Sequence, residues 1–201
     1  MIIIGLTGSI ASGKSSILNF IKKQNIPTHD SDAVVARLYN NPPKEFIYYL
    51  KSIGLTKFIK QKKIDKKKVR NKVLKNKEKL RKLERFIHKK VKLSRDKFII
   101  KNRRFRKKII VIDIPLLFEN NLETICDYVF LAYCPSFKLR VTRALKRNNM
   151  NKNILTKFIK LQMPDKLKII KSDFVINTSL TKNLTNAQTL RAIKTIKKTK
   201  Y

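Results

Sequence analysis

The stretch Gly8-Ser9-Ile10-Ala11-Ser12-Gly13-Lys14-Ser15 decides how this chain folds, and it matches the pattern GxxxxGK followed by Ser or Thr. An apolar run at residues 1–6 precedes it and favours a short buried strand. Apolar residues with helical spacing follow it, at Ile17, Leu18, Phe20 and Ile21. Three of the four glycines of the chain lie at positions 5, 8 and 13, so unusual backbone geometry is concentrated here. The sequence therefore predicts a strand, a phosphate-binding loop and a helix.

Each part of this loop has an expected role in binding a nucleoside triphosphate. Lys14 is expected to reach the β- and γ-phosphates and to act in catalysis, and the Ser15 hydroxyl to ligate Mg²⁺. The residues expected to contact the phosphates of ATP are Gly8, Ser9, Ala11, Ser12, Gly13, Lys14, Ser15 and Ser16. The alternative is a glycine-rich turn that only packs a strand on a helix, but packing alone requires neither Lys14 nor Ser15.

Further buried strands are predicted at residues 109–112, 128–132 and 174–176, with a short extended segment around 26–28 and a helix over 33–39. Helical patterns separate the later strands, which favours a parallel sheet with helices on both faces. The expected fold class is α/β, with a five-stranded parallel sheet of the P-loop NTPase type.

The segment at residues 57–108 has a different composition, with 26 Lys or Arg and only four acidic residues. Apolar residues still recur in it with helical spacing, at Val69, Val73, Leu80, Leu83, Ile87 and Val91. We therefore expect one unit with a core at 1–43 and 109–201 and a helical insertion at about 44–108.

The whole chain has 49 Lys or Arg against 13 acidic residues, a formal net charge of +36, and 42% hydrophobic residues. This balance is expected for a protein that binds polyanions.

No apolar run is long enough to span a bilayer and residues 1–6 do not resemble a signal peptide, so we expect a soluble cytoplasmic protein. Cys126 and Cys134 have no metal-ligand spacing and are expected to be buried free thiols.

Several nucleotide-binding classes are excluded by what the sequence lacks. The chain has no NKxD motif of a GTPase and no glycines left for the signature of a transporter ATPase, and it is short for a helicase. A small-molecule kinase remains, and the question is which hydroxyl accepts the phosphoryl group.

Six segments together resemble the dephospho-CoA kinase family in order and spacing. They are IGLTGSIASGKSSI at 4–17, IPTHDSD at 26–32, LERFIH at 83–88, DIPLLFE at 113–119, QMP at 162–164 and SDFVI at 172–176. The resemblance implies transfer of a phosphoryl group from ATP, with Mg²⁺, to the ribose 3′-hydroxyl of dephospho-coenzyme A. It also implies that the insertion binds this acceptor and that residues at about 138–165 form a mobile lid.

Two aspartates are candidates for the reaction itself. Asp32 follows the second strand, where open parallel sheets bind ligands, and is expected to be the base that takes the proton of the acceptor hydroxyl. The alternative is that Asp30 or Asp32 is only the N-cap of the next helix. Asp113 ends an apolar run and is expected to hold Mg²⁺ through water, or is a plain aspartate at a strand end.

Arg140, Arg143 and Arg147 follow the strand at 128–132 and share one face if the segment is helical. The resemblance places them in the lid, with Arg147 catalytic and Arg143 bound to phosphate. A solvated basic face is the alternative.

The acceptor-binding residues implied by the resemblance are His88, Leu116 and Glu119. A partly buried structural histidine is the alternative for His88, because Lys89 replaces the proline that usually follows it in the family. The chain departs from the family pattern again at Phe158 and at Asn177 and Thr178, on the side expected to contact adenine.

The charge of +36 exceeds what ATP and dephospho-coenzyme A require. The competing function is a P-loop kinase that acts on a nucleoside, a nucleotide or a polynucleotide end, with nucleic acid bound by the basic segment. Against it, the segment has only four aromatic residues, Phe58, Phe86, Phe98 and Phe105, at spacings expected for a core. Compositional drift towards Lys, Asn and Ile is a further explanation of the high positive charge.

We expect the protein to be a monomer.

Overall fold

The computed structural model describes residues 1–60, 63–147 and 150–199. The chain divides into two compact units, one formed by Met1–His29 with Asn102–Tyr201 and the other by Asp30–Lys101. The boundaries therefore fall at residues 30 and 101, whereas the composition shift suggested an insertion at about 44–108.

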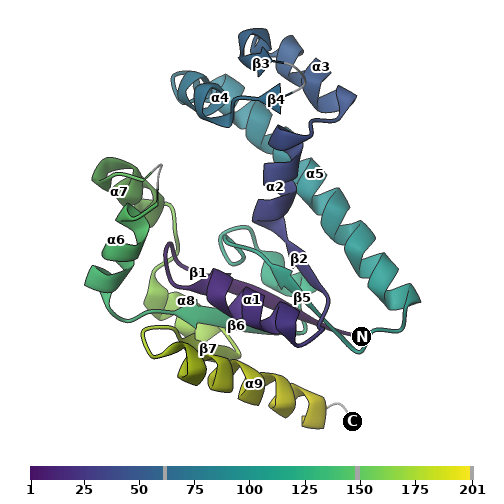
Figure 1. The fold of residues 1–201 in the computed structure, drawn as a ribbon, viewed down its shortest axis with the longest axis vertical. Helices are drawn as coiled ribbons and strands as arrows, with labels where there is room; N and C mark the ends of the chain where they lie inside the picture. The colour runs from purple at the N-terminus through teal and green to yellow at the C-terminus, as the bar shows by residue number, and fades with distance from the viewer. Residues whose placement is uncertain (61–62, 148–149, 200–201) are drawn as a thin grey trace. The chain divides into compact units, whose positions relative to one another are not determined.

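The first unit is built on a five-stranded parallel sheet with the strand order β2-β5-β1-β6-β7 (Figure 1). The strands are β1 (Ile2–Gly8), β2 (Thr28–Asp30), β5 (Ile109–Asp113), β6 (Tyr128–Tyr133) and β7 (Phe174–Asn177). In the centre, Leu6 of β1 pairs with Asp113 of β5 and with Phe130 of β6. The P-loop-type α/β fold expected from the sequence is confirmed, and β2 begins two residues later than the predicted extended segment.

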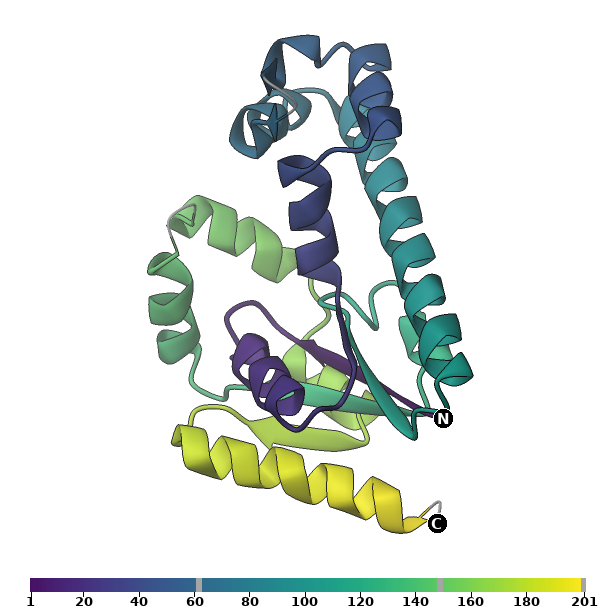
Figure 2. The ribbon, with the colours of Figure 1, turned by 45° about the vertical axis from the view of Figure 1, so that its right-hand side comes forward.

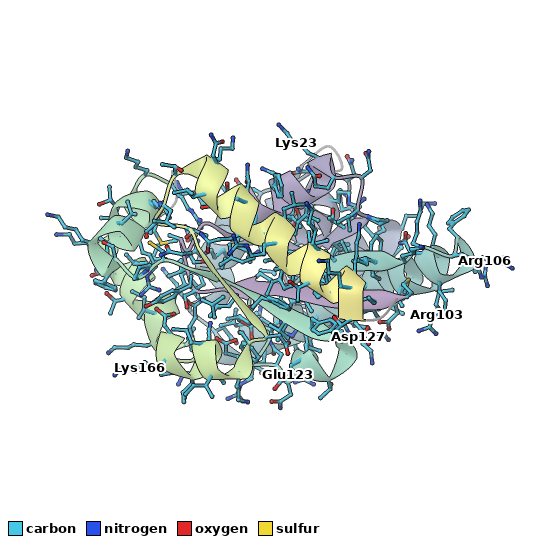
Figure 3. All side chains as sticks on the ribbon, turned by 90° about the horizontal axis from the view of Figure 1, so that it is seen from below. Lys23, Arg103, Arg106, Glu123, Asp127 and Lys166 are labelled. Carbon is cyan, nitrogen blue, oxygen red and sulfur yellow. The ribbon has the colours of Figure 1, made fainter. Side chains whose placement is uncertain are left out.

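Helices cover both faces of this sheet. On one face, α1 (Lys14–Lys23) and α9 (Lys182–Thr199) lie side by side, and their Ile17, Ile21 and Ile193 are buried against Ile4 and the neighbouring strands (Figures 1 and 2). On the other face lies α8 (Asp165–Lys171). Figure 3 shows the strands between α1, which carries Lys23, and α8, which carries Lys166. Helices bury both faces of the sheet, which explains why its strands are continuous apolar runs.

Two further helices, α6 (Phe137–Leu145) and α7 (Lys152–Lys160), pack against each other after β6. Together they span most of the segment at about 138–165 that is expected to form the lid. Residues 148 and 149 of this segment lie outside the described residues. The buried Ala144 and Leu155 of this pair form a cluster with Ala11 of the loop after β1. This cluster is a direct packing contact between α6, α7 and the loop.

The second unit contains α2 (Ser31–Asn40), α3 (Lys44–Ser52), the 3-10 turn η1 (Thr56–Phe58), the antiparallel pair β3 (Ile59–Lys60) and β4 (Lys63–Ile64), α4 (Lys66–Val73) and most of α5 (Lys77–Arg104). The amphipathic spacing of the basic segment is confirmed, because Val69, Val73 and Leu83 are buried in its core. Phe86 stacks on Phe46 and Tyr49 with ring centroids 5.3 and 4.3 Å apart.

The small β3–β4 hairpin was not foreseen, since two-residue strands leave no alternating pattern to detect. One expectation about the basic segment needs correction: Phe105, just past α5 and in the first unit, was expected in a core but is 64% exposed. Phe58 and Phe86 do pack against the core of the second unit.

Neither cysteine forms a disulfide, as expected, but only Cys134 is buried, while Cys126 is half-buried. Within the described ranges, no helix is both long enough and apolar enough to cross a membrane.

Candidate functional site

The loop between β1 and α1 adopts the shape that its glycines predict. Gly13 has φ +87°, a left-handed conformation, and a Cβ there would lie 2.9 Å from the Cβ of Thr178. A Cβ at Gly8 would lie 2.7 Å from the carbonyl oxygen of Ala132. Gly13, Lys14 and Ser15 form the N-terminal end of α1, where backbone amides have no acceptor inside the helix and can bind an anion.

Lys14, the first residue of α1, forms an ion pair with Asp113 at the end of β5. The two meet because β1 and β5 are neighbouring parallel strands, so the loop after β1 and the end of β5 lie at one edge. The Asp113 side chain is only 4% exposed. The alternative of a plain strand-end aspartate is therefore not sufficient, since this carboxylate holds the lysine of the loop.

The beginning of the loop is held by residues far away in the sequence. The Ser9 hydroxyl donates to Asp165 Oδ1 at 2.5 Å, and the Ile10 amide donates to Gln162 Oε1 at 2.9 Å. Gln162 belongs to the QMP segment, and Asp165 begins α8 directly after it. This segment fixes the conformation of the loop.

The end of the loop is held by Thr178, which follows β7 and is 5% exposed. Its hydroxyl lies within hydrogen-bond distance of the carbonyl oxygens of Ser12 and Tyr133. The same side chain lies where Gly13 would carry a Cβ. A residue that departed from the family pattern is thus a direct neighbour of the loop.

The three arginines expected in the lid have different environments. Arg140 pairs with Asp165 Oδ2 at 2.9 Å, and Arg143 Nη2 donates to the carbonyl oxygen of Thr178 at 2.9 Å. Arg147 is exposed and lies past the end of α6 at Leu145, so the three do not share one helical face. The alternative of a solvated basic face is wrong for Arg140 and Arg143.

Glu119 and Leu116 lie between β5 and η2 (Leu122–Ile125). Glu119 Oε1 accepts the Met163 amide at 2.8 Å and is 2.9 Å from Nζ of Lys168, which is fully buried. Glu119 Oε2 is buried with no hydrogen-bond partner among the described residues. Leu116 is 37% exposed, and its carbonyl accepts from Asn120 Nδ2 at 2.7 Å. Glu119 thus supports the QMP segment.

Asp32 and His88 lie in the second unit. Asp30 is the N-cap of α2, because its Oδ1 accepts the Ala33 amide at 2.9 Å. Asp32 is the second residue of this helix and exposed, so it is not the cap. His88 is exposed on α5, so the alternative of a partly buried structural histidine is wrong.

Asp165 and Thr178 are the loop contacts that sequence reasoning missed. They lie 156 and 166 residues from their partners Ser9 and Ser12, and only the strand order brings them together. The QMP segment could be identified in the sequence as a family feature, but its contact with the loop could not be predicted from the sequence.

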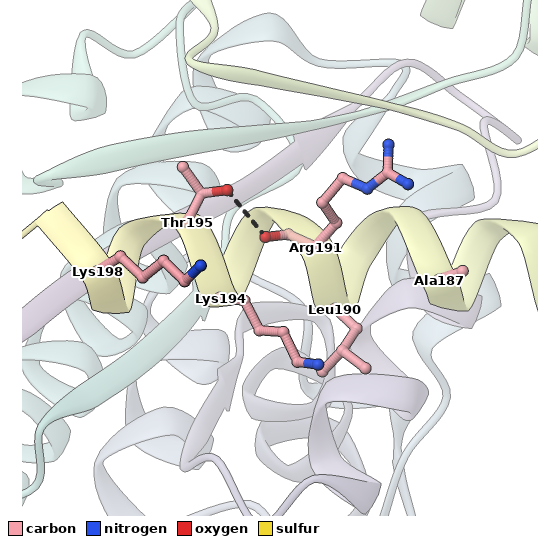
Figure 4. A pocket seen from close by; sticks show the side chains of 6 residues that line it. All are labelled: Ala187, Leu190, Arg191, Lys194, Thr195 and Lys198. Carbon is pink, nitrogen blue, oxygen red and sulfur yellow. Dashed lines mark hydrogen bonds between the residues drawn. The ribbon is translucent and has the colours of Figure 1, made fainter.

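A separate hollow of about 370 Å³ lies along α9. It is lined by Ala187, Leu190, Arg191, Lys194, Thr195 and Lys198, which all come from this one helix (Figure 4). None of them is a candidate site residue, so the hollow is not part of the site at the loop.

Comparisons with known proteins agree with this site. The model of the dephospho-CoA kinase family matches residues 2–183. The dephospho-CoA kinase of Bartonella henselae is 34% identical over 198 residues, which cover 98% of this chain and all of that protein. The dephospho-CoA kinase of Fusobacterium nucleatum is 32% identical over 180 residues, covering 89% and 90% of the two chains.

Solved structures share the fold. A protein from Thermus thermophilus has a TM-score of 0.77 at 25% identity, covering 96% of each chain. The dephospho-CoA kinase from Campylobacter jejuni has a TM-score of 0.73 at 23% identity, covering 99% of this chain and 98% of its own. With a phosphate loop held by Asp113 and Thr178, and with the family model matching nearly the whole length, this chain belongs to the dephospho-CoA kinase family.

Proposed function

We propose that this chain transfers the γ-phosphoryl group of ATP to the ribose 3′-hydroxyl of dephospho-coenzyme A, the last step of coenzyme A synthesis. The observation that carries the proposal is the phosphate loop, with Lys14 paired to a buried aspartate and the N-terminus of α1 at the end of the loop, in a chain of this family. The hydroxyl oxygen attacks the γ-phosphorus, the bond to the β-phosphate oxygen breaks, and ADP leaves.

Asp32 is the proposed base. The acceptor hydroxyl must lose its proton as the new P–O bond forms, and a carboxylate beside it accepts that proton. Support comes from Asp30, which caps α2 and leaves the neighbouring Asp32 without a capping role.

Lys14 and Arg147 are proposed to stabilise negative charge on the transferring phosphoryl oxygens. Arg147 is exposed just past α6, and its guanidinium has no contact among the described residues, in contrast to that of Arg143. The backbone amides at Gly13, Lys14 and Ser15 are proposed to bind phosphate oxygens.

The residues present fit a Mg²⁺ ion that arrives with ATP. Such ions commonly bind one or two carboxylates together with substrate phosphates and water, and Asp113 and Ser15 supply a carboxylate and a hydroxyl. No cluster of three or more His, Cys, Asp or Glu able to hold a metal occurs in the described part of the chain, so a cage made of protein side chains alone has no support there. The ion would neutralise charge between the β- and γ-phosphates.

The acceptor is proposed to bind the segment at about 44–108, with contacts from His88, Leu116 and Glu119, and the lid at about 138–165 to close over the nucleotide. Exposed lysines and arginines of the segment suit the phosphate groups of the acceptor. We further propose that the enzyme is a cytoplasmic monomer. No observation specifically favours nucleic acid as a partner, which remains an outcome of the test.

The test is a phosphoryl-transfer assay with Mg·ATP and four acceptors: dephospho-coenzyme A, adenosine, a nucleoside monophosphate and a DNA 5′-hydroxyl end. We expect transfer to dephospho-coenzyme A to dominate and to stop when EDTA removes the metal. Phosphorylation of DNA ends without phosphorylation of dephospho-coenzyme A would overturn the proposal.

A further inference from the structure

Two residues without an assigned role connect α6 to the phosphate loop. Asp165 binds Ser9 through Oδ1 and Arg140 of α6 through Oδ2, at 2.5 and 2.9 Å. Thr178 reaches the Ser12 carbonyl through its hydroxyl and accepts from Arg143 of α6 through its own carbonyl. Each arginine is therefore connected to the loop through one intermediate residue, Asp165 or Thr178.

The two contacts form a matched pair. Arg140 and Arg143 are three residues apart, so they lie on the same side of α6. Their partners hold the loop near its beginning and near its end, at Ser9 and Ser12. Between these two points, Ala11 is packed in a cluster with Ala144 of α6 and Leu155 of α7. The loop is thus contacted at three successive places. At two of them the contact is made by a residue that also binds α6, and at the third by α6 and α7 themselves.

Burial makes these contacts energetically relevant. Thr178 is 5% exposed, and the side chains of Arg140 and Asp165 are 16% and 26% exposed. Arg140 Nε and Arg143 Nη1 are buried and lack a hydrogen-bond partner among the described residues, while the other nitrogens of the two guanidinium groups contact Asp165 and Thr178. Hydrogen bonds to charged groups in such surroundings stabilise more than hydrogen bonds between neutral groups do.

We infer that Asp165 and Thr178 are positioning residues that transmit the placement of α6 to the phosphate loop. Arg140 and Arg143 then control ATP binding through the conformation of the loop, in two relays: Arg140 to Asp165 to Ser9, and Arg143 to Thr178 to Ser12. This inference goes beyond the proposed function and rests on it only in using ATP as the ligand.

The first test is a calorimetric titration of Mg·ATP into the whole protein without any acceptor. We expect Asp165→Asn and Thr178→Val to weaken ATP binding by about 10- to 100-fold, the affinity equivalent of one charge-assisted hydrogen bond. Thr178→Ser keeps the hydroxyl and should restore most of the affinity. Lys171→Ala is the matched control, since it removes an exposed charge from the same helix as Asp165, 3.6 Å from Glu123, and should leave ATP binding unchanged.

The second test separates the relays by double-mutant cycles. Arg140→Ala and Ser9→Ala act along one relay, so the double variant should bind ATP no more weakly than the worse single variant. Arg140→Ala combined with Thr178→Val removes contacts of different relays, and its losses should add. Additive losses within one relay would overturn the inference.

Loss of structure can be recognised separately. A variant that is only less stable lowers kcat in proportion to its unfolded fraction and leaves the KM for ATP unchanged, whereas a misplaced loop raises that KM. If Asp165→Asn lowers the melting temperature with ATP affinity unchanged, Asp165 is only a structural brace and the inference fails. Because the titration contains no acceptor, a wrong assignment of dephospho-coenzyme A would not change its result.

Discussion

Lys14 shows how one residue can combine a proposed role in chemistry with a role in stability. Its ammonium group pairs with Asp113, whose side chain is 4% exposed. The motif alone suggests that Lys14→Ala leaves the fold intact, because such a lysine would point into a polar cleft. The ion pair changes this expectation, since its loss leaves a buried carboxylate without its cation.

We expect Lys14→Ala to lower kcat/KM by roughly 10³-fold or more, because charge on the transferring group is no longer stabilised. The same variant should also lower the free energy of unfolding by on the order of 3 kcal/mol, the cost of breaking a buried ion pair. Urea unfolding measures this loss, and Lys14→Ala with Asp113→Asn is the control that should recover much of the stability and none of the activity. Near-normal turnover in Lys14→Ala would contradict the kinase proposal.

A second prediction concerns Asp32. Asp32→Asn keeps the size of the side chain but cannot accept a proton, so kcat should fall on the order of 10²- to 10⁴-fold with ATP affinity little changed. Asp30→Asn is the matched control, because asparagine caps a helix as well as aspartate and α2 should begin normally. A large loss of ATP affinity in Asp32→Asn would point to contact with the nucleotide instead of proton transfer.

At the scale of elements, α6 shows where a sequence pattern stops being informative. Helical spacing predicts that Arg140, Arg143 and Arg147 share a face, but the helix ends at Leu145 and leaves Arg147 beyond it. We expect Arg147→Ala to lower kcat and to weaken ATP binding together, because this guanidinium would touch phosphate before and during transfer. Steady-state kinetics with an ATP titration measure both, and unchanged values would return Arg147 to the solvated surface.

Helix α2 offers a pH-dependent prediction through Tyr39. Burial raises the pKa of Tyr39 from 10.0 to about 12, since a phenolate is poorly solvated in the core of the second unit. Below pH 10 both folded and unfolded chains hold the neutral phenol. Between pH 10 and 12 only the unfolded chain ionises, so stability is lost over this range, by about 2 kcal/mol.

Midpoints of urea unfolding at pH 9 and pH 11.5 measure whether Tyr39 causes this loss of stability. The loss between the two pH values should be smaller in Tyr39→Phe than in the unchanged protein. Tyr48→Phe is the control, since Tyr48 is 66% exposed and should keep the full loss. Equal losses in all three proteins would show that Tyr39 ionises freely.

The elements also show how far the sequence could predict the site. Local patterns were enough for β1, the phosphate loop and α1, because glycine positions, apolar runs and helical spacing lie within about 20 residues of one another. The contacts of Asp165 and Thr178 were not predictable in this way. They depend on the strand order β5-β1-β6-β7, which places distant chain segments at one edge. Glu119 was assigned to the acceptor from the resemblance, and only the structure reveals its buried partner Lys168.

For the whole molecule, the net charge of +36 predicts a strong effect of salt. A positive field raises the rate at which anionic substrates arrive, and its range shrinks from about 30 Å at 10 mM salt to about 8 Å at 150 mM. We expect kcat/KM for ATP to fall by about 10-fold over this range, with kcat unchanged. Steady-state kinetics at constant free Mg²⁺ measure this, with an uncharged viscogen as the control. A fall in kcat with constant KM would mean that salt acts on the chemical step or on the fold.

The strand order has a consequence for how such a chain can grow. Strands β2 and β5 are neighbours in the sheet, yet residues 31–108 lie between them in the sequence. Neighbouring parallel strands always need a crossover of about a dozen residues, so a connection has to exist at this place in any case. The connection of residues 31–108 is longer than that minimum by between two and three doublings, and each doubling adds only about 0.6 kcal/mol of closure entropy. The nucleotide-binding sheet can therefore accept insertions of different size here at little thermodynamic cost, which makes this crossover the natural place to exchange one inserted module for another.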